Sequence, residues 1–516
     1  MNGFSDGPWA ELSRRIVERG VVVVVSAGNE GQNGPLSSGT GSNGHGVLSV
    51  AAINVTGDPD MGSSDPGARP MAAPFTSWGP TNEMLLKPDV GAPGYRIVST
   101  LLRQRFGMAD GTSMAAPYVA GVAALYIGKH GGRAVHGPGF AKRMASRIIS
   151  SGRSVAWCTG HGMPRPALAA SPFQVGTGLV NAQKVLESTT DLSFEPFALL
   201  DTKRFRPEWT VQIANEGKDP VRYSFELEPQ PGVGLNDRLG GINALQTLEP
   251  LTLVPNVSLP DPLLVSPGAK ASARWVGHGR RPSGRGRLTG DRVVFSPPEH
   301  VGDDEAFPLY GGKLWVKGDG GEELCIPYGG AAYDVEKAFD TLLHVKTVIR
   351  AEERGWAWSF DTEKDPSDYV DLRADFRYPC YYFRWDIFAS GWTERDWTYP
   401  PLVGKRGHVG SAAAVQVSSW QRQYRPERHN KSDTVAFPQL RVPRGNAAFW
   451  WFGKLADGTQ IVAGNYTMRV AALRPHGNPH VSGHWDVMRM EVPSVAILAR
   501  NGTRSVTATS GARSPN

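Results

Sequence analysis

The sequence predicts an α/β domain with a parallel sheet, followed by all-β sandwich domains. Before residue 190, apolar helical patterns alternate with short apolar strands, such as the five consecutive valines 21–25. After residue 190, alternating apolar and polar residues dominate, as in half-buried strands. A chain of 516 residues is also too long for a single core. We therefore expect the α/β domain over 1–189, β-rich sandwich domains over 190–340 and 341–501, and a disordered tail over 502–516.

The composition is that of an ordinary globular protein, with 20% charged and 40% hydrophobic residues. The formal charge of +6 is spread along the chain, and its densest arginines (280, 281, 285 and 287) lie in a Gly/Ser/Pro-rich loop. We expect them to be solvated, so nucleic acid is not an expected partner. No stretch has the length of a membrane span. Cys158, Cys325 and Cys380 lie far apart, which allows one disulfide or none.

The first elements form a helix–strand unit that ends in a polar turn. Residues 8–19 predict an amphipathic helix that stops at Gly20. The valines 21–25 then predict a strand buried in a parallel sheet, and Ser26 to Gly31 form the turn after it. Ligands bind at this carboxyl end of the strands in open α/β sheets. Further strands are expected at 47–54 and 97–100.

The segment from Asp110 to Tyr126 predicts a helix with Ser113 at its start. The helix is apolar on all sides, which predicts a position inside a larger domain. Pro117 has no N–H group, so the Ser113 carbonyl loses its usual helical hydrogen bond. Unpaired N–H groups and the helix dipole favour negative charge there. This position suits a nucleophile whose substrate passes through an oxyanion.

Residues 111–117 (Gly-Thr-Ser-Met-Ala-Ala-Pro) resemble the nucleophile motif of the subtilisin-like serine proteases, the subtilases or peptidase S8 family. Residues 26–29 (Ser-Ala-Gly-Asn) resemble the subtilase segment whose asparagine donates to the oxyanion. The segments 75–80 and 87–94 resemble family motifs between these two, in the right order. The resemblance implies peptide-bond hydrolysis through an acyl-enzyme on Ser113, with Asn29 in the oxyanion hole. It also implies that substrate is bound by Ser26, Ala27, Gly28 and Thr112.

The residues that would activate Ser113 do not follow the family pattern. A serine hydroxyl needs a base to take its proton and a carboxylate to orient that base. Subtilases carry these as Asp and His motifs upstream of the asparagine. The 28 residues before Asn29 contain Asp6 and no histidine, and the first histidine, His45, follows Asn29. We expect either a truncated longer protein or a degenerate relative, with little peptidase activity of residues 1–516 alone.

Other interpretations of the catalytic segment remain open. Asp89 and Asp110 are interpreted as turn residues and not as the triad acid. Gly111 to Ala115 also resembles a nucleophile elbow, with His130, His136 and His161 downstream, but residues 103–110 make a poor preceding strand. The competing class is a non-catalytic, secreted, β-rich interaction protein that carries a relic protease segment.

The C-terminal two-thirds predict β-sandwich modules. Residues 209–215 and 221–227 alternate around a turn and predict a β-hairpin. With Asp201 and Thr202 they resemble the fibronectin-type-III-like domain of large secreted subtilases. A second hairpin is expected from 449–455 and 464–470. The many tryptophans favour an aromatic core over a carbohydrate-binding face.

The remaining expectations concern partners and location. The resemblance implies polypeptide substrates, an extracellular parent protein and no cofactor; the structural calcium ions known in the family cannot be read from these residues. The N-terminus shows no signal peptide. Sequons that could carry N-glycans occur at Asn54, Asn256, Asn430, Asn465 and Asn501.

Overall fold

A computed structural model describes the following residues: 3–55, 69–158, 164–235, 244–273, 294–298, 307–344, 346–350, 356–488 and 495–499. The chain divides into two compact units, Met1–Ala338 and Phe339–Asn516. The boundary expected near residue 190 falls inside the first unit and stays a prediction, as does the fibronectin-like character of the segment after it.

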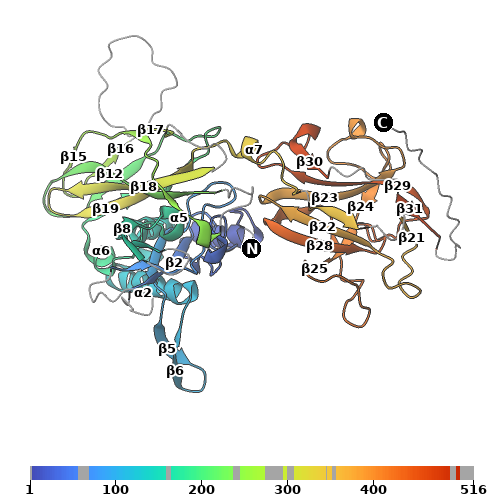
Figure 1. Ribbon diagram of the computed structural model, residues 1–516. Coiled ribbons are helices and arrows are strands. Elements are labelled where there is room, and N and C mark those ends of the chain that lie inside the picture. The colour runs from blue at the N-terminus through green and yellow to red at the C-terminus, as the bar shows by residue number, and fades with distance from the viewer. Residues whose placement is uncertain are drawn as a thin grey trace, which may run out of the picture. The chain divides into compact units, whose positions relative to one another are not determined.

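The α/β part of the first unit is built on a six-stranded sheet (Figure 1). Its order is β1-β2-β3-β7-β8, and β4 also pairs with β2. The first three long strands, β1, β2 and β4, run parallel, so their carboxyl ends meet at one edge. The strands are β1 (Val24–Ser26), β2 (Leu48–Asn54), β3 (Met71–Ala72), β4 (Val90–Pro93), β7 (Ala156–Cys158) and β8 (Pro164–Ala169).

Helices cover this sheet, and the longest of them packs on its centre. Helix α2 places Ala115, Val119 and Val122 in a core with Val50 of β2 and Val90 of β4. These side chains recur at helical spacing on one face, which is what the sheet requires of a covering helix. The helices are α1 (Pro8–Glu18), α2 (Thr112–His130), α3 (Arg133–His136), α4 (Phe140–Ser150), α5 (Pro172–Val175), α6 (Ala182–Glu187) and α7 (Val335–Ala338).

Two sequence-based expectations about burial are wrong. The valine strand is an edge strand: among the described residues β1 pairs only with β2, and Val21 is 44% exposed. Helix α2 is buried only on the face toward the sheet, and its other face exposes Tyr118, Leu125 and Ile127. An element that is apolar on all sides is fully buried only if other elements cover every side. Among the described elements, neighbours cover only one side of β1 and one side of α2.

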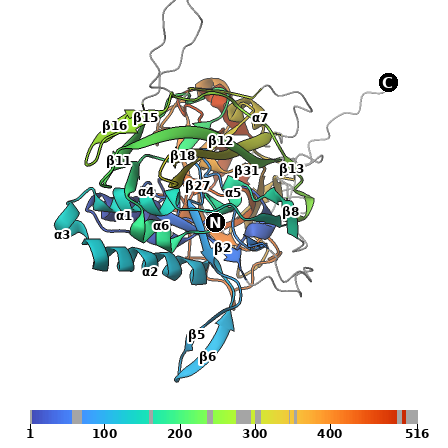
Figure 2. The same cartoon turned by 90° about the vertical axis from the view of Figure 1, so that its left-hand side faces the viewer.

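A two-stranded ribbon projects from the first unit beside α2. Strands β5 (Ile97–Leu101) and β6 (Arg105–Ala109) pair antiparallel and lead directly into the Ser113 segment (Figures 1 and 2). Its exposed apolar side chains are Val98, Leu101, Leu102, Phe106 and Met108. An isolated ribbon of this kind buries little apolar area, so its own pairing contributes little stability.

The rest of the first unit consists of three further sheets, β10-β19-β18-β12-β13 with β15, β16-β11-β9, and β14-β17. The hairpin expected from 209–215 and 221–227 is wrong, because β11 and β12 belong to different sheets. Strand β11 alternates between buried and more exposed residues, whereas β18 and β19 are buried over most of their length. The strands are β9 (Thr190–Ser193), β10 (Phe197–Leu200), β11 (Val211–Asn215), β12 (Val221–Gly234), β13 (Pro250–Leu251), β14 (Asn256–Ser258), β15 (Leu263–Val265), β16 (Lys270–Ala273), β17 (Val294–Ser296), β18 (Pro308–Gly318) and β19 (Glu323–Ala331).

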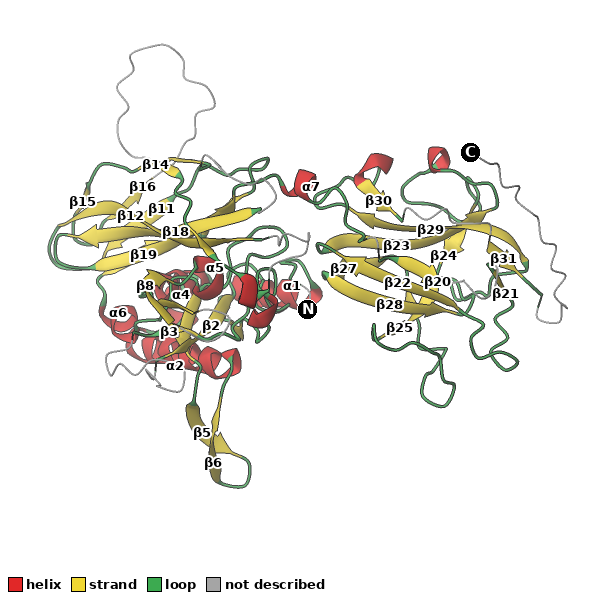
Figure 3. Ribbon diagram, viewed as in Figure 1, coloured by secondary structure: helices red, strands yellow, loops and turns green. Residues whose placement is uncertain are grey.

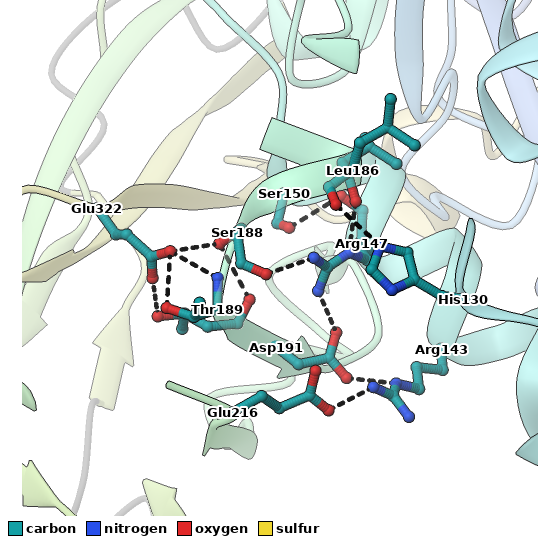
Figure 4. A network of polar contacts seen from close by, with 12 residues as sticks. His130, Arg143, Arg147, Ser150, Leu186, Ser188, Thr189, Asp191, Glu216 and Glu322 are labelled. Carbon is teal, nitrogen blue, oxygen red and sulfur yellow. Dashed lines mark hydrogen bonds and ion pairs between the residues drawn. The ribbon is translucent and has the colours of Figure 1, made fainter. Parts of the chain in front are cut away.

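Ion pairs tie the α/β part to these strands (Figure 4). Arg143 and Arg147 of α4 both reach Asp191 of β9, with N–O distances of 2.6 and 3.4 Å. Asp191 and Arg147 are each less than a tenth exposed. Glu322 accepts hydrogen bonds from the Ser188 hydroxyl and the Thr189 N–H beside them. These contacts link helix α4 and the residues before β9 to residues that follow later in the same unit.

The second unit contains two mixed-length β-sheets (Figure 3), β20-β22-β28-β25-β26 and β21-β31-β29-β23-β24, the latter also holding β27 and β30. The expected hairpin of 449–455 with 464–470 is wrong, because β28 and β29 lie in different sheets. Of the tryptophans, 358, 385, 450 and 451 are fully buried, which confirms the aromatic core. The strands are β20 (Val348–Arg350), β21 (Ala357–Trp358), β22 (Val370–Phe376), β23 (Cys380–Ala389), β24 (His408–Ser411), β25 (Ala413–Val417), β26 (Val435–Ala436), β27 (Gln439–Val442), β28 (Gly445–Trp451), β29 (Gly464–Leu473), β30 (Trp485–Val487) and β31 (Val495–Ile497).

Several smaller expectations can be compared with the structure. The three cysteines are buried and form no disulfide. Asn54 is 1% exposed, so the expected glycan at Asn54 does not fit the folded domain; Asn256, Asn430 and Asn465 are exposed. Asn501, His161, the arginines 280–287 and the tail 502–516 lie outside the described residues. Among the described helices, none combines the length and apolar composition needed to cross a membrane.

Candidate active site

The structure brings Asn29 and the start of α2 together at the carboxyl edge of the parallel sheet. Asn29 follows β1 by three residues, and its Oδ1 accepts hydrogen bonds from the Thr112 N–H (2.9 Å) and the Thr112 hydroxyl (2.8 Å). The Thr112 hydroxyl in turn accepts from the Gly28 N–H at 3.2 Å. These three bonds join two segments 83 residues apart and fix the orientation of the Asn29 carboxamide.

This arrangement leaves the donating end of Asn29 free to face the nucleophile. Because Oδ1 is occupied by Thr112, the Nδ2 group is the part of the amide that remains available. A Cβ built on Gly111 would lie 3.5 Å from Asn29 Nδ2 and also 3.5 Å from the Ser113 N–H nitrogen. Both donors therefore border the same small space beside Gly111. An oxyanion hole requires such a pair of N–H donors, and this role of Asn29 stays a prediction.

Gly28 holds the turn between β1 and Asn29. Its φ of +110° is a conformation that side-chain-bearing residues rarely adopt, and a Cβ there would lie 2.7 Å from Ser77 Oγ. The Ser77 N–H donates to the Gly28 carbonyl at 2.9 Å, and Ser77 Oγ accepts from the Glu30 N–H at 3.0 Å. The segment 75–80 thus stabilises the turn that contains Asn29.

The sequence-predicted substrate residues divide into two groups. Ser26 and Gly28 are half-exposed and border the site. Thr112 and Ala27 are 1% exposed, so their side chains are buried, and substrate binding by these two residues stays a prediction. Thr112 orients Asn29, a positioning role that the motif alone did not reveal because it depends on a contact across the fold.

Ser113 is exposed, and its hydroxyl has no hydrogen-bond partner among the described residues. His45 precedes β2 at the amino edge of the sheet, opposite the edge where Asn29 and Ser113 meet. Partial burial lowers the pKa of His45, and the nearby Lys87 ammonium lowers it further. His45 is therefore not placed to take the Ser113 proton.

Two histidines of the elbow alternative, His130 and His136, also lie elsewhere. His130 is 17 positions along α2 from Ser113, which corresponds to about 25 Å at 1.5 Å per residue. Its Nε2 lies 3.0 Å from the Leu186 carbonyl, and His136 bonds the His130 carbonyl at 2.9 Å. The strand before Ser113 is the exposed β6 of a ribbon, not a strand of the parallel sheet. The described geometry does not support a nucleophile elbow.

The two candidate aspartates have other partners. Asp89 is 3% exposed and pairs with Lys87 Nζ at 2.6 Å, while its Oδ2 accepts from the Ser49 N–H at 2.7 Å. Asp110 accepts a hydrogen bond from the Arg96 N–H at the base of the β5–β6 ribbon. Both act as structural residues. Within the described part of the chain, no group of three acidic, histidine or cysteine side chains is placed to hold a metal ion.

The segment that holds Asn29 and Ser113 is similar to known proteins. Residues 4–147 match the model of the subtilase family, Peptidase_S8. The chain is 38% identical over 117 residues to Subtilisin E of Bacillus subtilis (strain 168). It is 39% identical over 127 residues to Subtilisin-like protease SBT3.6 of Arabidopsis thaliana, and 34% over 132 residues to the Extracellular basic protease of Dichelobacter nodosus. Residues 4–147 are thus similar to the subtilase family.

The matched region is a small part of each protein. It covers 22% of this chain and 26% of Subtilisin E, and 15% and 18% of the Arabidopsis and Dichelobacter proteins. The chain therefore spans about a quarter or less of these three relatives. The solved structure of the prenylagaramide maturation protease PagA aligns with 35% of this chain and 56% of its own, at 20% identity and a TM-score of 0.26.

Proposed function

We propose that this protein is a serine endopeptidase that cleaves polypeptides through an acyl-enzyme on Ser113. The observation that carries the proposal is the bond from Thr112 to Asn29 Oδ1, which leaves Nδ2 beside the Ser113 N–H. In this reaction Ser113 Oγ attacks the scissile carbonyl as a base removes its proton. The tetrahedral oxyanion is stabilised by Asn29 Nδ2 and the Ser113 N–H. The C–N bond then breaks as the proton passes to the leaving amine, and water releases the acyl group.

The base must come from a segment that the described residues do not include. We propose that a polypeptide segment with the subtilase Asp and His motifs packs on the open side of the α/β part. Three neighbouring features support this occupant: the free edge of β1, the exposed apolar face of α2, and the apolar β5–β6 ribbon. A strand added to β1 would satisfy its edge N–H and C=O groups and would cover α2. The same segment would bring an imidazole to Ser113. A secreted location follows from the same family assignment.

A fluorophosphonate probe tests both parts of the proposal. We expect residues 1–516 alone to be labelled slowly, at the rate of Ser113→Ala, because no described base removes the hydroxyl proton. Co-folding with the part of Subtilisin E that precedes the matched segment is expected to raise labelling at Ser113 and not in Ser113→Ala. Fast labelling of Ser113 in the chain alone would show that residues 1–516 already contain the base. If the added segment protects the β1 amides from exchange but Ser113 is still not labelled, the role of Ser113 as the nucleophile is refuted.

The unpaired Ser113 hydroxyl also favours a second candidate, a non-catalytic β-rich interaction protein with a relic protease segment. The two candidates differ in one measurement. A relic is expected to stay unlabelled even with the added segment bound, whereas a protease segment is expected to become reactive.

A further inference from the structure

A loop of the second unit is held in place by hydrogen bonds to residues in and next to strand β22. It runs from 418 to 434, between β25 and β26. Arg373 of β22 is 9% exposed, and its guanidinium donates to the carbonyls of Ser419 (3.0 Å) and Gln421 (2.6 Å). Tyr424 is buried against Trp450, and its N–H donates to the Tyr369 hydroxyl at 3.1 Å. The loop therefore keeps its shape without a ligand.

His429 contacts two other residues of the same loop, Gln421 and Arg425. The Ser418 N–H donates to Gln421 Oε1 at 2.9 Å, so the Gln421 amide presents Nε2 to the His429 ring, 3.1 Å from its Nε2. The Arg425 N–H donates to His429 Nδ1 at 3.0 Å, and this nitrogen also lies 3.1 Å from the Arg425 carbonyl oxygen. Both ring nitrogens contact other residues of the loop, so His429 helps to hold the loop in this conformation.

The braced loop surrounds a hollow of about 270 Å³ that is lined by polar side chains only: Gln421, Arg422, Gln423, Arg425, Arg428 and His429. Among the described residues, the guanidinium groups of the three arginines make no ion pair or hydrogen bond. Three like charges around one hollow repel one another, and a bound anion would remove that repulsion.

We propose that this hollow binds a tetrahedral oxyanion, a sulfate or phosphate group, through Arg422, Arg425 and Arg428. The planar guanidinium presents two parallel N–H donors that match two oxygens of such a group. The hollow is larger than one such ion, so it also accommodates the sugar or alcohol of an ester. Trp420, 83% exposed and adjacent to Gln421 in sequence, offers a flat apolar surface for that part.

Calorimetric titration of the full chain tests the site, with sodium sulfate, sodium phosphate and a sulfated disaccharide at constant ionic strength. We expect saturable binding that weakens at least tenfold in Arg425→Ala and in Arg428→Ala. Arg428→Lys is expected to lose less, because a point charge remains without the paired donors. Arg395→Ala, which removes another exposed arginine of the same unit, is the matched control and is expected to bind as the parent does. Urea unfolding verifies that the variants keep their fold.

The outcomes separate clearly. Tighter binding of the disaccharide than of free sulfate identifies an ester ligand, and equal binding identifies the free ion; both support the site. Absence of saturable binding, or an equal loss in Arg395→Ala, overturns the proposal, because general charge attraction would then explain the effect.

Discussion

Substitution of Thr112 by valine is the sharpest test of how the site is held together. Valine has nearly the volume of threonine but lacks the hydroxyl, which is 1% exposed together with its side chain. The change removes the bond to Asn29 Oδ1 (2.8 Å) and leaves the Gly28 N–H without its acceptor at 3.2 Å. The Thr112 N–H still holds Asn29 at 2.9 Å.

The expected cost follows from these contacts. Two part-buried hydrogen bonds are lost, each worth about 0.5–1.5 kcal/mol, so Thr112→Val is expected to lower the free energy of unfolding by about 1–3 kcal/mol. Thr112→Ser is the matched control, because it keeps the hydroxyl and loses one methyl group, about 1 kcal/mol. We further expect the Gly28 amide to exchange faster in Thr112→Val than in Thr112→Ser.

Urea unfolding and amide hydrogen exchange of the two variants provide the measurements. The reasoning is refuted if Thr112→Val unfolds at the same urea concentration as the parent while Thr112→Ser is less stable. That result would mean that packing of the methyl group, and not the hydrogen bonds to Asn29 and Gly28, holds the two segments together.

Three further predictions concern buried groups. Lys87→Met leaves the Asp89 carboxylate buried without its ammonium partner and is expected to cost about 3–5 kcal/mol in urea unfolding, part of which the double change with Asp89→Leu restores; a loss below 1 kcal/mol would contradict the pairing. Gly28→Ala is expected to cost more than 1 kcal/mol, because φ is +110° and the new Cβ meets Ser77 Oγ, and an unchanged unfolding midpoint would disprove the strain. Burial raises the pKa of Asp386, but its neighbours His408, Arg384 and Ser411 lower it to about 2. Since this folded-state pKa lies below the ordinary 3.8, the carboxylate stabilises the second unit by about 2 kcal/mol above pH 4, and this is lost as the pH falls toward 2. Asp386→Asn is expected to flatten that part of the pH–stability curve, and an unchanged slope would show that another group titrates.

Local patterns predicted the individual elements well. The helix at 8–19 and the strand at 47–54 are present within one residue of the expected ends, and the helix that begins near Ser113 is present as α2. These elements follow from periodicity and from stop signals such as Gly20, which act over a few residues. Both predicted hairpins failed for the opposite reason. Alternation shows that a segment is a strand with one apolar face, but it does not show which strand lies beside it.

The sequence alone determined that Ser113 starts a helix, that Asn29 follows a strand, and that both carry subtilase-like motifs, because these features are written in neighbouring residues. Only the tertiary structure decided that Thr112 orients Asn29, that His45 lies at the opposite edge of the sheet, and that α2 and β1 each keep one side open. Such relations join residues tens of positions apart. They depend on how the strands are ordered and paired, which no short stretch of the chain specifies.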